Sequence, residues 1–151
     1  MVAQSADALG MKLVGYDPYI SVDAAWRLPK EVQKANSIEE LVGCSDFISI
    51  HVPLVDSTKD LISKDLLKHF KQGSKLINLS RGGIVNNNDV IEALQSKILS
   101  SFVTDFPSIE LSQRANDFGD VILLPHIGAS TSEAEVNLSL IHISEPTRPD
   151  Y

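Results

Sequence analysis

Five short runs of mainly apolar and β-branched residues recur along the chain. They are residues 12–17 (KLVGYD), 47–53 (FISIHVP), 75–81 (KLINLSR), 102–106 (FVTDF) and 121–126 (VILLPH). Each run is almost continuously apolar, which is the pattern of strands buried on both faces of a parallel sheet. We therefore predict five strands from these runs.

Segments with helical signals separate the runs. Residues 37–40, 63–67 and 88–94 each begin with Ser or Asn, which favour the N-cap position, and each places an acidic side chain in the following turn. Strands that alternate with helices through short loops are typical of α/β domains. The pattern predicts an α/β fold with a parallel sheet.

The two ends of the chain depart from this alternation. Residues 3–9 have a helical pattern that Gly10 can close, whereas an α/β domain usually opens with a strand before such a helix. Residues 138–151 contain prolines and have no clear period, and their text SLIHISEPTRP resembles the translation of a sequencing adaptor. We expect residues 1–137 to form a partial domain and residues 138–151 to be a disordered or artefactual tail.

Composition excludes several classes of partner. The chain has 13 Lys and Arg against 20 Asp and Glu and a net charge of −7, so it offers no broad basic face to nucleic acid. No apolar run has the roughly 20 residues that span a bilayer, and the N-terminus does not have the pattern of a signal peptide. Cys44 is the single cysteine, which favours a reducing compartment. We expect a soluble, cytoplasmic protein.

Two charged residues follow predicted strands at the edge where open α/β sheets bind ligands. Asp17 can accept hydrogen bonds from ribose hydroxyls and would repel the 2′-phosphate of NADP; the alternative is a turn aspartate before Pro18. Arg81 precedes Gly82 and Gly83, and its guanidinium can bind a carboxylate through two parallel hydrogen bonds. The alternative, a surface arginine beside a turn, stays open.

His126 ends the last predicted strand, where imidazole could transfer a proton near neutral pH. A nearby carboxylate would orient the ring and favour imidazolium, and Glu110 is the candidate if the fold brings it there. The remaining histidines have no spacing typical of a metal site. Cys44 has no cationic neighbour in the sequence, and we predict that it is buried and inert.

Taken in order, these segments resemble the D-isomer-specific 2-hydroxyacid dehydrogenases. GYDP, HVPL, INLSRGG, TDFP and LPHIGAST follow one another as in that family, and the resemblance covers residues 2–137. It implies a Rossmann-like, doubly wound parallel sheet that binds NAD, with a small 2-hydroxy acid as substrate. Residues 17–28 and 126–137 are most similar to members that oxidise D-3-phosphoglycerate in serine biosynthesis.

The resemblance also implies roles for individual residues. Arg81 would bind the substrate carboxylate and keto oxygen, His126 would transfer the hydroxyl proton, and Glu110 would orient and charge the imidazole. Asp17 would hold the adenosine ribose, and Asp105 the nicotinamide amide. The other implied cofactor contacts are at Val52, Pro53, Leu79, Ser80 and Gly128, besides Arg81 and His126.

The chain departs from the family in two respects. It contains no G-x-G-x-x-G loop, and the family's first strand and that loop would precede Val2. Because the first strand normally lies in the middle of the sheet, we expect an incomplete sheet with unpaired backbone groups. We therefore predict that the isolated chain is unstable, or that residues 12–17 and 75–81 fail to pair unless the sheet collapses. At residues 105–111 the family's Asp-Val-Phe…Glu-Pro pattern is rearranged.

Three functions stay open for the intact protein. The first is oxidation of D-3-phosphoglycerate, the second another 2-hydroxyacid dehydrogenase activity such as glyoxylate or hydroxypyruvate reduction, and the third a non-catalytic, NAD-sensing co-repressor. The presence of Arg81, Glu110 and His126 favours an enzyme. We expect the intact protein to be a homodimer or homotetramer without a metal, and this chain alone to be inactive.

Overall fold

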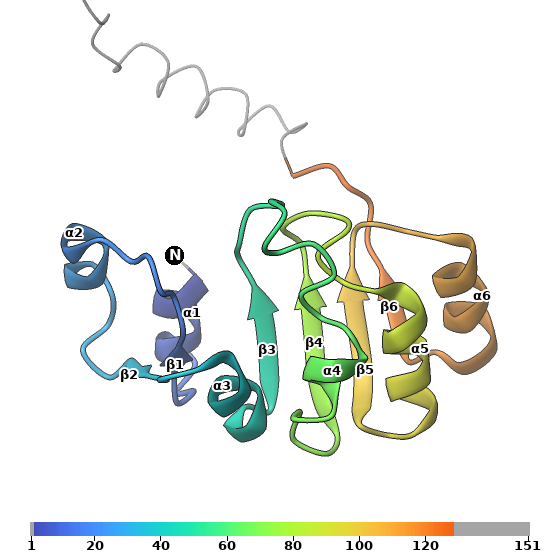
Figure 1. Cartoon of the computed structure of the whole chain (residues 1–151), viewed down its shortest axis with the longest axis horizontal. Helices are drawn as coiled ribbons and strands as arrows, with labels where there is room; N and C mark the ends of the chain where they lie inside the picture. The colour runs from blue at the N-terminus through green and yellow to red at the C-terminus, as the bar shows by residue number, and fades with distance from the viewer. Residues whose placement is uncertain (1, 129–151) are drawn as a thin grey trace, which may run out of the picture.

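The computed structural model describes residues 2–128 (Figure 1). Its helices are α1 (Val2–Ala8), α2 (Val22–Trp26), α3 (Ile38–Cys44), α4 (Lys64–Leu67), α5 (Asn87–Gln95) and α6 (Ile109–Phe118). Its strands are β1 (Val14–Gly15), β2 (Gln33–Lys34), β3 (Phe47–Ile50), β4 (Ser74–Asn78), β5 (Leu99–Thr104) and β6 (Val121–Leu123). Within these residues, no helix is long and apolar enough to cross a membrane. The expected tail, residues 138–151, lies outside the described residues.

The strands form two parallel sheets, which confirms the predicted α/β class. β1 pairs with β2, and the larger sheet has the order β3-β4-β5-β6. As predicted, β1 and β4 do not pair, but the reason differs from the one we expected: β3 and β5 occupy the two edges of β4. The prediction overlooked β2, because Gln33 and Lys34 are polar and exposed and give no apolar signal.

The hydrophobic core lies on one face of the larger sheet. Two rows of aligned residues face it: Ile48, Leu76, Phe102 and Val121, then Ile50, Asn78, Thr104 and Leu123. Helix α5 packs against β5, and α4 and α6 pack against α5, so these helices cover the same face (Figure 1). On β3 burial alternates, with Phe47 and Ser49 exposed, so burial on both faces was a wrong prediction for this strand.

Residues 2–34 contribute little to the core. None of them is buried, and the first buried residue of the chain is Ala35. Helices α1 and α2 have no buried residue at all. The stability of the described part therefore rests on the larger sheet and the helices packed on it.

Helix N-caps agree closely with the sequence. Ser37 begins α3, and its hydroxyl accepts a hydrogen bond from the backbone N–H of Glu40 (3.2 Å). Asn86 does the same for α5 through the N–H of Asp89 (3.2 Å), slightly earlier than predicted. Ser63 begins α4 without such a bond. Short capped helices between parallel strands bring the carboxyl ends of β3, β4 and β5 to one edge, as their arrowheads show in Figure 1.

Candidate active site

A histidine and a carboxylate meet at the carboxyl edge of the larger sheet. Asp105 follows β5 and His126 follows β6, and the Asp105 Oδ2 atom lies 2.8 Å from His126 Nδ1. The Asp105 side chain is 11% exposed, whereas the His126 side chain is 59% exposed. Because Nδ1 faces the carboxylate, Nε2 is the ring nitrogen that remains for a ligand.

The second oxygen of Asp105 has no hydrogen-bond partner within residues 2–128. This atom, Oδ1, is buried. A buried carboxylate oxygen without a donor costs about 1–3 kcal/mol, so a ligand that supplied an N–H there would be stabilised. The carboxylate can thus hold His126 with one oxygen and receive a ligand donor with the other.

Arg81 lies in the loop that leaves β4 at the same edge. Its side chain is exposed, and its Nη1 donates to the carbonyl oxygen of Ser80 (2.7 Å). The buried side chain of Asn78, the last residue of β4, binds this loop on both sides: its amide nitrogen donates to the carbonyl of Arg81 (3.0 Å) and its amide oxygen accepts from Ser80. Within residues 2–128 the guanidinium makes no ion pair, so its other N–H groups can bind an anionic ligand.

Phe106 connects the arginine loop to the histidine. A Cβ added at Gly82 would lie 3.3 Å from Phe106 Cδ1, so the loop backbone passes close to this ring. The Phe106 and His126 rings have centroids 4.9 Å apart. Three successive strand ends of the larger sheet therefore bring Arg81, Asp105 and His126 into one neighbourhood.

The structure does not bring Glu110 to His126, contrary to our expectation. Glu110 lies in the first turn of α6, which Ser108 caps, and no ion pair within residues 2–128 joins it to the histidine. Hydrogen bonds from its own backbone N–H and from Ser108 lower the pKa of the Glu110 carboxyl from its ordinary value. The Ser108 cap therefore directs this carboxylate toward the helix N-terminus, and Asp105 takes the place beside the ring.

The remaining predicted cofactor residues are spread along the strand ends. Asp17 follows β1 in the smaller sheet, and its Oδ1 accepts the N–H of Tyr19 (2.9 Å) in an exposed turn. The positions after the strands of the larger sheet are half-buried at Val52 and Ser80 and exposed at Pro53, Leu79 and Gly128.

Cys44 is exposed, so the prediction of a buried thiol was wrong. It is the last residue of α3, a helix in which Val42 alone is buried, and its Sγ donates to the carbonyl of Leu41 (3.4 Å).

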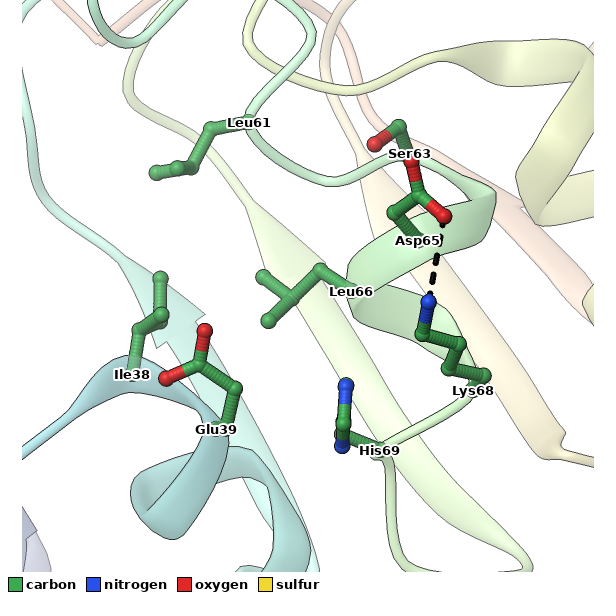
Figure 2. A pocket seen from close by; sticks show the side chains of 8 residues that line it. All are labelled: Ile38, Glu39, Leu61, Ser63, Asp65, Leu66, Lys68 and His69. Atoms are coloured by element: carbon green, nitrogen blue, oxygen red, sulfur yellow. Dashed lines mark hydrogen bonds and ion pairs between the residues drawn. The ribbon is translucent and has the colours of Figure 1, made fainter.

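A hollow of about 330 Å³ lies elsewhere, between α3 and α4 (Figure 2). Its lining is Ile38, Glu39, Leu61, Ser63, Asp65, Leu66, Lys68 and His69. It shares no residue with the edge that holds His126. In Figure 2 Lys68 and Asp65 form an ion pair at one side of the hollow, and Ile38, Leu61 and Leu66 lie across from it together with Glu39.

Comparison with known proteins identifies the family. The model of the NAD-binding domain of D-isomer-specific 2-hydroxyacid dehydrogenases matches residues 1–128. The chain belongs to this family. Its cofactor is therefore NAD, and the family's members are NAD-dependent oxidoreductases that act on a CH–OH group.

Relatives by sequence include two D-3-phosphoglycerate dehydrogenases. The protein of Synechocystis is 36% identical over 149 residues, which cover 97% of this chain and 26% of the relative. The protein of Rattus norvegicus is 40% identical over 136 residues, or 89% of this chain and 25% of the relative. The chain thus spans about a quarter of the length of these curated relatives.

Solved structures of the family have the same fold. The holo form of D-mandelate dehydrogenase from Rhodotorula graminis has a TM-score of 0.79 at 29% identity, over 94% of this chain and 41% of that chain. D-lactate dehydrogenase with NAD⁺ from Lactobacillus jensenii has a TM-score of 0.78 at 25% identity, over 94% and 46%.

Sequence reasoning missed two residues of this site. Asn78 is an uncharged residue inside an apolar run, and Phe106 resembles any core aromatic, so neither has a chemical signal of its own. Only the position of Asn78 in the sequence could have indicated its role. It is the only amide in the run at 75–81 and comes shortly before the Ser-Arg-Gly-Gly turn.

We predict that Gly82→Ala in the full-length protein lowers kcat/KM by up to about tenfold, since small displacements of reacting groups are costly. The new Cβ would press on Phe106 at 3.3 Å and so displace the ring that contacts His126. Steady-state kinetics would measure the change. Gly15→Ala, whose Cβ would meet Val32 at an ordinary 3.5 Å, is the control; equal losses in both variants would contradict the prediction.

Proposed function

We propose that the full-length protein containing this chain oxidises D-3-phosphoglycerate to 3-phosphohydroxypyruvate with NAD. The observation that carries the proposal is the Asp105–His126 pair beside the Arg81 loop, at the ligand edge of an NAD-binding domain. The choice of substrate within the family rests on the relatives at 36% and 40% identity, both D-3-phosphoglycerate dehydrogenases.

Three residues of the chain would have separate roles in the oxidation. Bound NAD supplies the acceptor for the hydride that leaves C2 of the substrate. The Arg81 guanidinium binds the substrate carboxylate and fixes C2 relative to the histidine. As the C2–H bond breaks, the hydroxyl proton passes to His126 Nε2 and the C2–O bond becomes a carbonyl. The Asp105 carboxylate stabilises the imidazolium that forms.

The residues at the edge fit the cofactor. Asp105 Oδ1, which has no hydrogen-bond partner in the described part of the chain, is the acceptor that the nicotinamide amide would need. Asp17 would accept the adenosine ribose hydroxyls, and the strand ends at Val52, Pro53, Leu79, Ser80 and Gly128 would line the dinucleotide. Asp105 would then contact both cofactor and proton carrier.

We predict that Asp17→Ser narrows the preference for NAD over NADP by at least about tenfold, or ~1.4 kcal/mol. The wild-type carboxylate is exposed beyond β1, where it would repel a 2′-phosphate. The ratio of kcat/KM for the two cofactors measures the effect. Asp23→Ser, which removes a carboxylate from α2, is the matched control. An unchanged ratio in Asp17→Ser would mean that Asp17 does not contact the adenosine ribose.

Assay of the full-length protein tests the function. NADH formation would be followed with D-3-phosphoglycerate, D-glycerate and D-lactate, and glyoxylate and hydroxypyruvate would be tried in the reducing direction. We expect the highest kcat/KM with D-3-phosphoglycerate. A higher value with an unphosphorylated acid would assign another dehydrogenase activity, and NAD binding without turnover of any of these acids would favour the sensing role. We also propose that the full-length protein is cytoplasmic and forms a homodimer or a homotetramer.

A further inference from the structure

Asn78 is a buried amide at the centre of the candidate site. It is 2% exposed and is the last residue of β4, in the row that runs from Ile50 to Thr104 across the sheet. Burying an amide without hydrogen bonds is costly, so its partners show what the residue is used for.

Within residues 2–128, the Asn78 side chain finds all its hydrogen-bond partners in the three residues that follow it. Its Oδ1 accepts from the backbone N–H of Ser80 (3.2 Å) and from the Ser80 hydroxyl (2.9 Å). Its Nδ2 donates to the carbonyl oxygen of Arg81 (3.0 Å). The side chain thus uses both an acceptor and a donor, a combination that Asp or Leu at this position would not offer.

The position of the Arg81 guanidinium depends on this turn. Its hydrogen bond is to the carbonyl of Ser80, inside the loop that Asn78 closes. Among the salt bridges within residues 2–128 none involves Arg81, so no carboxylate fixes it from outside. An interaction that fixes the backbone of residues 79–81 therefore also fixes the position of the guanidinium.

We propose that Asn78 is a positioning residue for Arg81. By holding Ser80 and the Arg81 carbonyl, its side chain keeps the guanidinium facing the ligand edge, where it binds the carboxylate of a 2-hydroxy acid. The inference rests on the proposed function for Arg81 and adds the residue through which the arginine is oriented.

A double-mutant cycle on the full-length protein tests the proposal. Asn78→Ala is expected to raise KM for the hydroxy acid about tenfold, with a smaller change in Kd for NAD. In an Arg81→Ala background the same substitution is expected to cause no further loss of kcat/KM, because it acts through the arginine. Additive losses in the two backgrounds would mean a merely structural effect and would overturn the proposal.

Ser74→Ala is the matched control for a buried polar change in β4. Ser74 is 2% exposed, lies at the opposite end of the strand, and its hydroxyl has no hydrogen-bond partner within residues 2–128. This variant is expected to leave KM unchanged. A similar rise in KM in both variants would show that any disturbance of β4 has the effect, and the proposal would be wrong.

A second measurement separates this inference from the proposed function. The rate at which phenylglyoxal modifies Arg81, located by peptide mass spectrometry, is expected to change in Asn78→Ala because the guanidinium is no longer held. An unchanged rate overturns the role of Asn78 even if the enzyme is active. A changed rate in a protein that turns over no hydroxy acid would refute only the proposed function.

Discussion

Arg114→Ala is expected to lower the free energy of unfolding by about 3 kcal/mol, because it leaves a largely buried carboxylate without its partner. In α6 the Arg114 guanidinium binds Asp120 through two contacts, Nη2–Oδ2 at 2.6 Å and Nε–Oδ1 at 3.0 Å. The two side chains are 6% and 14% exposed. The hydrogen bonds that Arg114 donates to Asp120 raise the pKa of the Arg114 guanidinium, which keeps its charge.

This ion pair also holds the turn that joins α6 to β6. Arg114 stacks over the Phe118 ring at 4.0 Å, and Gly119 ends α6 in the left-handed conformation. The carbonyl of Asp120 then accepts the N–H of Phe102, which starts the pairing of β6 with β5. Loss of Arg114 would thus loosen β6, the strand that precedes His126.

Urea unfolding of the chain, followed by circular dichroism, would measure the loss. If the wild-type chain has no cooperative transition, as we expect from its incomplete sheet, hydrogen exchange of the β6 amides in the full-length protein gives the same comparison. Glu92→Gln removes one partner of the exposed Lys64–Glu92 pair and is expected to change little. Equal effects of the two substitutions would mean that the buried pair is no stronger than a surface pair.

The sequence predicted the larger sheet well because its strands are apolar and its helices are capped. It placed the carboxyl ends of the strands too late: the runs at 75–81 and 121–126 continue past Asn78 and Leu123, where the strands end. Leu79 and Leu124 follow these ends and are 48% and 41% exposed. Exposed apolar residues that follow a strand at the carboxyl edge of the sheet cannot be distinguished in the sequence from residues of the strand itself.

The candidate site was predicted in part for a related reason. Arg81 and His126 follow strands, and parallel strands bring their carboxyl ends together whatever lies between them. In the structure His126 contacts Asp105 rather than Glu110, and spacing in the sequence cannot tell which of the two carboxylates faces the ring. The Ser108 cap places Glu110 in the first turn of α6, while Asp105, directly after β5, needs no turn to reach His126.

Asp105→Asn in the full-length protein is expected to lower kcat/KM for oxidation by about 10²-fold, within the range that acid–base catalysis contributes. The amide could still hydrogen-bond His126 Nδ1, but it would not offset the charge of the imidazolium. Steady-state kinetics of the oxidation would measure the loss.

A comparison of Glu110→Gln with Asp105→Asn tests which of these two carboxylates assists His126 in proton transfer. The lowered pKa of Glu110 keeps its carboxyl ionised down to a lower pH than usual, so the substitution removes a full charge across the assay range. We expect a loss in kcat/KM of less than about tenfold, since Glu110 stays at the N-terminus of α6 and makes no ion pair with His126 in the described part of the chain. If instead Glu110→Gln lowers kcat/KM by about 10²-fold and Asp105→Asn does not, then Glu110 and not Asp105 assists His126, and the Asp105–His126 contact at 2.8 Å is not the one used in catalysis.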